Sequence, residues 1–220
     1  MATQERNGLP LAAVASTFSF LSALFHFIVL VFYGKYIKDL RRGINKFRWW
    51  EYALSSSVMI MLIALLFGVW DILNLINIMA INACMNLFGL LFEEMNANNR
   101  EAGIKTVDWQ AFIFGCFAGI IPWVQIFAPI IASSGESNPP GFVWGILIAY
   151  AIMFNTFPIN MFLQYMQVGP WDNKRYPDMT NGGYYFGEKI YQILSLVAKS
   201  LLIWLIVAGV NQPQDASDLN

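Results

Sequence analysis

The chain has 220 residues, of which 57% are hydrophobic and only 12% are charged. Soluble domains carry about 25% charged residues, so this composition predicts a membrane protein. The net charge of −1 excludes a basic surface for nucleic acid. Two cysteines, Cys84 and Cys116, exclude a disulfide scaffold or a cysteine zinc cluster, and one histidine cannot build a histidine metal site.

Long apolar stretches with few charges predict six membrane spans, because a helix needs about 20 apolar residues to cross a bilayer. In chain order, the predicted spans are 11–34, 46–69, 72–94, 109–133, 141–166 and 184–210. The Asn-Pro-Pro-Gly segment at 138–141 has the composition of a loop and separates the fourth span from the fifth. No repeat and no second domain are recognisable, so residues 1–220 are expected to form a single transmembrane domain.

The basic residues of the connections predict the orientation of the chain in the membrane. Eleven of the 13 lysines and arginines lie in the connections after the first, third and fifth spans: Lys35, Lys38, Arg41, Arg42, Lys46, Arg48, Arg100, Lys105, Lys174, Arg175 and Lys189. The opposite face carries only Arg6. These three connections are therefore expected to be cytoplasmic, and the C-terminus is expected to be non-cytoplasmic.

Lys199 is the one basic residue in the middle of a predicted span. It follows Lys189 by ten residues, which at 1.5 Å per residue places it about 15 Å from the membrane surface. An unpaired charge at that depth costs at least about 3 kcal/mol. We interpret Lys199 as a functional amine suited to Schiff-base chemistry, with a lysine that merely faces a polar crevice as the alternative. Glu188, Gln192 and Ser195 precede it at spacings that place all four on one helix face.

Glu51 is the carboxylate best placed to pair with this lysine. It lies one turn inside the second predicted span, and Ser55 follows it one turn later, whereas the other acids lie at span ends. Helical side chains tilt toward the N-terminus of their helix, so the lysine reaches toward the cytoplasmic side, where Glu51 starts. We predict that Glu51 pairs with Lys199; an interfacial pair between Glu51 and Arg48 is the alternative.

Several segments resemble the heliorhodopsin family. Residues 48–60 (RWWEYALSSSVMI) resemble its third-helix signature, and 194–200 (LSLVAKS), with Trp204 after it, resemble its retinal-lysine segment. Its second, fourth, fifth and sixth helices are similar to residues 21–27 (LSALFHF), 82–89 (NACMNLFG), 119–123 (GIIPW), 154–155 (FN) and 163–165 (LQY). The family has seven helices and this chain begins at the second, so the resemblance implies an all-α, rhodopsin-like bundle with six transmembrane helices.

The resemblance also implies a chromophore site. It places all-trans retinal on Lys199 as a protonated Schiff base with Glu51 as its counterion, and it implies a C-terminus outside the cell. Ser55 and Ser195 match positions near the Schiff base, and His26 matches a histidine linked to proton handling there. The positions that match the retinal pocket are Asn82, Met85, Trp123, Phe154 and Trp204. Plain helix packing is the alternative role for these aromatic residues.

These features predict a light-absorbing photoreceptor rather than an enzyme. A proton pump needs a second relay acid, but no carboxylate follows Glu51 on its helix face before Asp71, so a light sensor is favoured over a pump. A light-gated ion channel or transporter that uses the Lys199–Glu51 pair is the alternative, and a chromophore-free helical scaffold is a third. The expected partners are retinal, the lipid bilayer, a second copy in a homodimer and a signalling protein that the sequence does not identify.

Overall fold

The computed structural model describes residues 11–133, 141–175 and 182–210, and within them the chain is helical without any strand. Six long helices are α1 (Leu11–Val31), α3 (Lys46–Leu66), α4 (Ile72–Glu101), α5 (Gln110–Ser133), α6 (Gly141–Met166) and α7 (Gly182–Val210). A short helix, α2 (Tyr33–Arg41), and two 3-10 turns, η1 (Gly169–Trp171) and η2 (Asn173–Arg175), lie in the connections. The predicted all-α bundle is confirmed, and a long helix lies at each of the six predicted spans.

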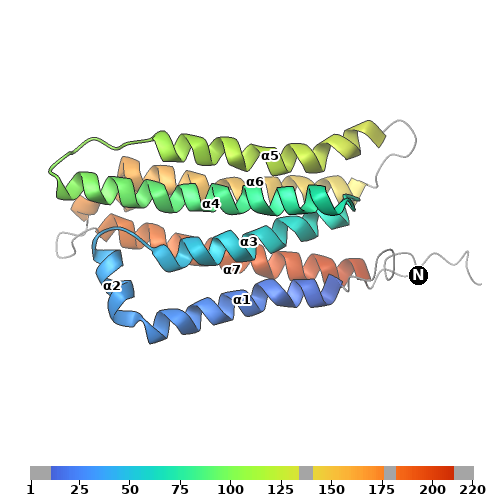
Figure 1. Cartoon of the computed structure of the whole chain (residues 1–220), viewed down its shortest axis with the longest axis horizontal. Helices are drawn as coiled ribbons and strands as arrows, with labels where there is room; N and C mark the ends of the chain where they lie inside the picture. Colours follow the sequence, from blue (N-terminus) through green and yellow to red (C-terminus); the bar gives the residue numbers. More distant parts are fainter. Residues whose placement is uncertain (1–10, 134–140, 176–181, 211–220) are drawn as a thin grey trace, which may run out of the picture.

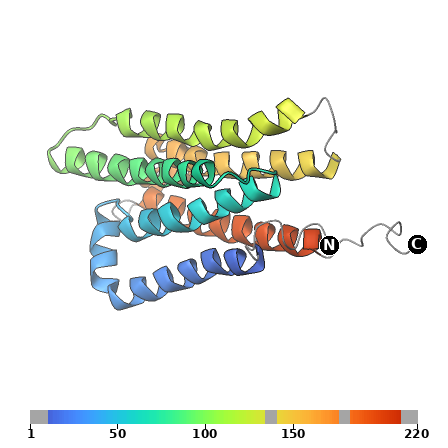
Figure 2. The same cartoon turned by 45° about the vertical axis from the view of Figure 1, so that its right-hand side comes forward.

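The six long helices run side by side along one common direction (Figure 1, Figure 2). α1 lies at one edge of the bundle, where it contacts α3 and α7. α5 lies at the opposite edge and packs on α4, which in turn packs on α3. α3 therefore connects the two sides of the bundle, and α7 closes it between α1 and α6.

Local sequence signals define both ends of the turn between α3 and α4. Gly68 has a φ of +87°, a left-handed conformation that glycine adopts without strain, and it follows the last turn of α3. Asp71 then caps α4, because its side chain accepts a hydrogen bond from the backbone N–H of Asn74 at 2.7 Å. At the other end of α3, Asn45 caps the helix through the N–H of Arg48 at 3.1 Å.

By length and composition, four helices of the described part of the chain can cross a membrane: α3, α4, residues 110–128 of α5 and residues 147–166 of α6. A fifth span results if α1 and α2, which are bent by 89° relative to each other, are counted together. α7 carries Glu188, Lys189 and Lys199 within its length. The predicted turn at 138–140 and the tail after 210 lie outside the described residues.

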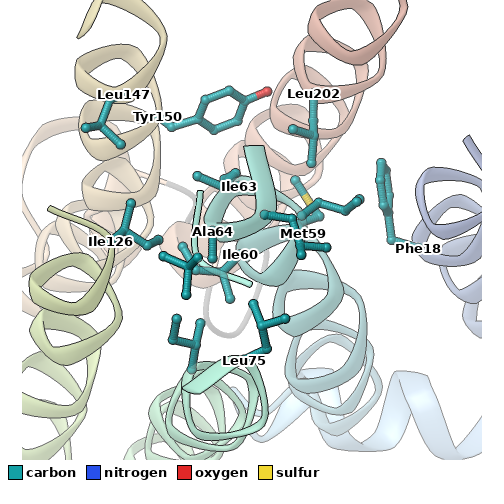
Figure 3. Packing of buried hydrophobic residues seen from close by; sticks show 14 of the residues in the cluster. Phe18, Met59, Ile60, Ile63, Ala64, Leu75, Ile126, Leu147, Tyr150 and Leu202 are labelled. Carbon is teal, nitrogen blue, oxygen red and sulfur yellow. The ribbon is translucent and has the colours of Figure 1, made fainter. Parts of the chain in front are cut away.

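Two clusters of buried side chains hold the bundle together. The larger is mainly aliphatic and centres on α3; Ile60 and Ile63 of α3 belong to it together with Leu147 of α6 and Leu202 of α7 (Figure 3). The smaller lies near the start of α3 and is largely aromatic; its buried members are Trp49, Tyr52, Phe92, Ala111, Met161 and Tyr191. Both clusters contribute residues to the wall of one internal cavity, which therefore lies between them.

Candidate functional site

The amine of Lys199 and the carboxylate of Glu51 form an ion pair between α7 and α3. Lys199 Nζ lies 2.5 Å from Glu51 Oε1, and the two side chains are only 14% and 9% exposed. Ser55, one turn further along α3, donates a hydrogen bond to the same oxygen at 3.0 Å. Two charges withdrawn from water tolerate burial when they are paired and hydrogen-bonded, as these are.

Ser22 of α1 is the third partner of this pair. Its hydroxyl oxygen lies 2.7 Å from Glu51 Oε1 and receives a hydrogen bond from Lys199 Nζ at 2.5 Å. His26, one turn further along α1, donates from Nδ1 to the Ser22 carbonyl at 2.7 Å, and its ring is exposed. His26 therefore adjoins the pair through Ser22 and does not contact it directly.

A cavity of about 480 Å³ begins at Lys199 and extends among the helices α3 to α7. Five further residues from the predicted site line it: Ser55, Met85, Trp123, Phe154 and Ser195. Trp123 of α5 and Phe154 of α6 meet edge to face, with ring centroids 5.4 Å apart. The cavity wall is therefore mainly apolar and aromatic, with the lysine and a few polar groups at defined places.

Two predicted pocket residues lie away from the cavity wall. Asn82 is buried behind it and donates to the hydroxyls of Ser56 at 2.8 Å and Ser57 at 3.1 Å, which joins α4 to α3. Trp204 is 71% exposed on α7 and does not line the cavity. Sequence position alone does not give the rotation of α7, and this rotation turns Trp204 outward.

Two glycines leave space for the cavity at the contact between α4 and α5. Gly115 and Gly119 line it, and the sequence shows them only as a Gly-x-x-x-Gly spacing with a general role in helix packing. A Cβ atom added at Gly119 would lie 2.8 Å from Met85 Sδ. Gly119 therefore lets Met85 reach the cavity wall.

A second buried charge cluster lies near the start of α3. Arg48 pairs with Glu93 of α4 at 2.5 Å and with Glu188 of α7, and all three side chains are at most 6% exposed. Glu93 also accepts from Trp49 Nε1 at 2.7 Å and from the Asn45 N–H at 2.8 Å. Arg48 is thus engaged by two other acids, and the alternative pairing of Arg48 with Glu51 does not occur.

The face of α7 that carries Glu188, Ser195 and Lys199 is only partly a buried polar face. Glu188 is buried, and Ser195 and Lys199 are half-buried at the cavity, but Gln192 between them is exposed. The four residues share one face of α7 as predicted, but this face is not buried along its whole length. Gln192 therefore borders the buried polar side chains and does not line the cavity.

Ser22 and the double pairing of Arg48 are the features that the sequence did not identify. The available signal for Ser22 is its spacing from Ser19 and His26, three residues after one and four before the other, which places three polar side chains on one face of a largely apolar helix. For Arg48 the signal is the excess of buried acids, because Glu93 and Glu188 each need a positive partner inside the bundle.

The comparison with known families agrees with this geometry. The heliorhodopsin family model matches residues 1–210, which is nearly the whole chain. No curated protein matches the chain. With its helical bundle and apolar spans, the chain is an integral, multi-pass membrane protein that binds retinal, and it belongs to the heliorhodopsin family.

Proposed function

We propose that this protein is a light sensor that holds all-trans retinal on Lys199 as a protonated Schiff base, with Glu51 as the counterion. The observation that supports the proposal best is the Lys199–Glu51 ion pair at the wall of the aromatic cavity. An amine and a carboxylate 2.5 Å apart and shielded from water are what a positively charged Schiff base needs.

The cavity fits a retinal group. Its volume of about 480 Å³ falls in the range of small-molecule pockets, about 300–1,000 Å³, which are mostly apolar with a few polar groups that fix orientation. Trp123, Phe154, Phe157 and Tyr191 supply flat apolar walls for a conjugated chain. When bound, retinal supplies visible absorption and changes shape when it absorbs light.

Residues of the chain itself would attach the retinal and stabilise its positive charge. Lys199 would hold the aldehyde carbon of retinal through its amine as a C=N bond, with one molecule of water released. Glu51 supplies the negative charge that stabilises the positive nitrogen, and hydroxyls of Ser22 and Ser55 lie against the same carboxylate oxygen. These contacts join Lys199 of α7 to Glu51 of α3 and Ser22 of α1, so a change at the Lys199 nitrogen would act on all three helices.

The absence of a relay acid argues for a sensor and against a pump. A light-driven proton pump passes its proton between acids on both sides of the Schiff base, but no carboxylate follows Glu51 along its face of α3 before Asp71, and the part of α7 beyond Lys199 carries no acid. Signalling would then require a partner protein, and the family resemblance supports a homodimer.

Illumination of the protein in sealed vesicles tests this function. We expect no sustained pH change across the membrane, with or without a protonophore, and no light-dependent current in voltage clamp. A sustained pH change that the protonophore abolishes would show a pump, and a light-dependent current would show the channel alternative.

A further inference from the structure

α2 leaves α1 almost at a right angle. The two helices bend by 89° around Phe32, so α2 lies along the membrane surface if α1 crosses the membrane. In Figure 1, α2 runs across the end of the bundle from α1 to the start of α3. Phe32 and Tyr33, at the bend, are exposed, as aromatic side chains at the headgroup level of a bilayer are.

The nine residues of α2 separate into two faces. One face packs on the bundle: Leu40 is buried, and the ring of Tyr36 lies 6.2 Å from that of Phe47 in α3. The opposite face carries Lys35 and Lys38, which are exposed and three residues apart. The acid of this helix, Asp39, is buried and forms no ion pair with either lysine.

Lys35 and Lys38 differ from three basic residues that follow them in the chain, Arg42, Lys46 and Arg48. Arg42 pairs with Glu101 at 2.7 Å, Lys46 pairs with Glu94 at 2.6 Å, and Arg48 pairs with two buried acids. Neither Lys35 nor Lys38 forms an ion pair with any acid in the described part of the chain. Two adjacent positive charges at the membrane surface therefore remain available.

We propose that the exposed face of α2, formed by Lys35 and Lys38, binds the headgroups of anionic lipids. If α1 crosses the membrane, α2 lies in the plane of the lipid phosphates; its other face packs on α3, and the lysines of its exposed face are positive. Each lysine near an anionic membrane surface is worth about 1 kcal/mol. Bound lipids would hold α2 in place and connect α1, which carries Ser22, to the membrane.

Photo-crosslinking in vesicles tests this proposal on the full-length protein. The vesicles contain a photoactivatable phosphatidylglycerol or, in parallel, the corresponding phosphatidylcholine, and mass spectrometry quantifies the lipid attached to residues 32–42. We expect wild-type protein to attach phosphatidylglycerol preferentially, with a yield that falls as salt rises. The K35Q/K38Q double variant should lose this preference about fivefold for each lysine removed.

Two control variants make the result specific. K35R/K38R keeps both charges and should keep the wild-type yield, which separates charge from side-chain identity. K105Q/K174Q removes two exposed lysines from other connections at the same end of the bundle and should leave the yield at residues 32–42 unchanged. Inorganic phosphate should not compete, since the site recognises phosphate within a membrane surface.

Equal yields for the two lipids in wild-type protein would overturn the proposal. An unchanged yield in K35Q/K38Q, or an equal loss in K105Q/K174Q, would also overturn it. Competition by inorganic phosphate would assign the lysines to soluble anions.

Discussion

At the scale of single residues, one carboxylate oxygen organises the candidate site. Glu51 Oε1 is approached by Lys199 Nζ, Ser22 Oγ and Ser55 Oγ, which come from three different helices. Hydrogen bonds from Ser22 and Ser55 thus hold the carboxylate of Glu51 beside the amine. Loss of this charge would therefore remove the nearest electrostatic stabilisation of a positive nitrogen at Lys199.

Glu51→Gln should move the absorption of the protein with bound retinal to longer wavelength. A nearby negative charge stabilises the ground state of the protonated Schiff base, and a charge pair at about 4 Å is worth about 4 kcal/mol near a protein surface. Loss of that stabilisation narrows the excitation gap, so we expect a red shift of tens of nanometres. The measurement is a visible spectrum in mildly acidic solution, where the Schiff base stays protonated.

Ser55→Ala is the matched control for this variant. It removes one hydrogen bond to Glu51 and leaves the charge in place, so its shift should be small. A spectrum of Glu51→Gln that coincides with the wild-type spectrum would show that Glu51 is not the counterion.

The pairing of Glu51 with Lys199 could be predicted because the apolar spans offer very few charges. Once Lys199 lies near mid-membrane, Glu51 is one of the few acids that do not lie at a span end. The part played by Ser22 could not be predicted in the same way. A serine in a membrane helix often only bonds to the backbone of its own helix. The contact of Ser22 with Glu51 and Lys199 depends on the packing of α1 against α3 and α7, which the sequence does not specify.

At the scale of the elements, the Arg48 cluster fixes three helices near the start of α3. Arg48 comes from α3, Glu93 from α4 and Glu188 from α7, and Asn45 Nδ2 adds a hydrogen bond to Glu188 at 2.6 Å. Arg48 also stacks on Tyr191, with its guanidinium carbon 3.8 Å from the ring centroid. The cluster therefore holds α3 and α7 in the register that places Glu51 beside Lys199.

Arg48→Gln should destabilise the folded protein strongly. Removal of one partner from a buried ion pair costs about 3–5 kcal/mol, because the remaining charge stays buried without compensation, and here two carboxylates lose their cation. Thermal unfolding in a single detergent measures this loss as a lower Tm.

Arg42→Gln provides the comparison for that experiment. The Arg42–Glu101 pair is exposed, so its loss should cost no more than about 1 kcal/mol. Equal melting temperatures for the two variants would show that the buried cluster does not hold the helices together.

The sequence predicts the long helices far better than the short one. In lipid every backbone N–H and C=O must be paired within the segment, so a long apolar stretch has almost no alternative to a helix. Residues 33–41 carry no such constraint, and their charges indicate only a connection. In the structure α2 buries Leu40 and places Tyr36 against Phe47 at the start of α3, and the sequence alone does not specify this contact.

At the scale of the whole molecule, the distribution of basic residues predicts the orientation. Eleven of 13 lysines and arginines lie in the connections at one end of the bundle, and positive charges mark the cytoplasmic side. A tag added after Asn220 should therefore react with a membrane-impermeant reagent in intact cells, whereas a tag inserted between α4 and α5 should react only after lysis. The opposite pattern of labelling would reverse the orientation.

The cavity depends on the whole bundle, because residues from five helices form its wall around the amine of Lys199. A visible absorption spectrum of the purified protein with added all-trans retinal tests the central claim most directly. Lys199→Ala is the test variant, and Lys189→Ala, an exposed lysine on the same helix, is its control. We predict a band far to the red of free retinal in the wild-type and Lys189→Ala proteins and no such band in Lys199→Ala. A band that persists in Lys199→Ala, or a wild-type protein without one, would contradict the assignment of retinal to Lys199.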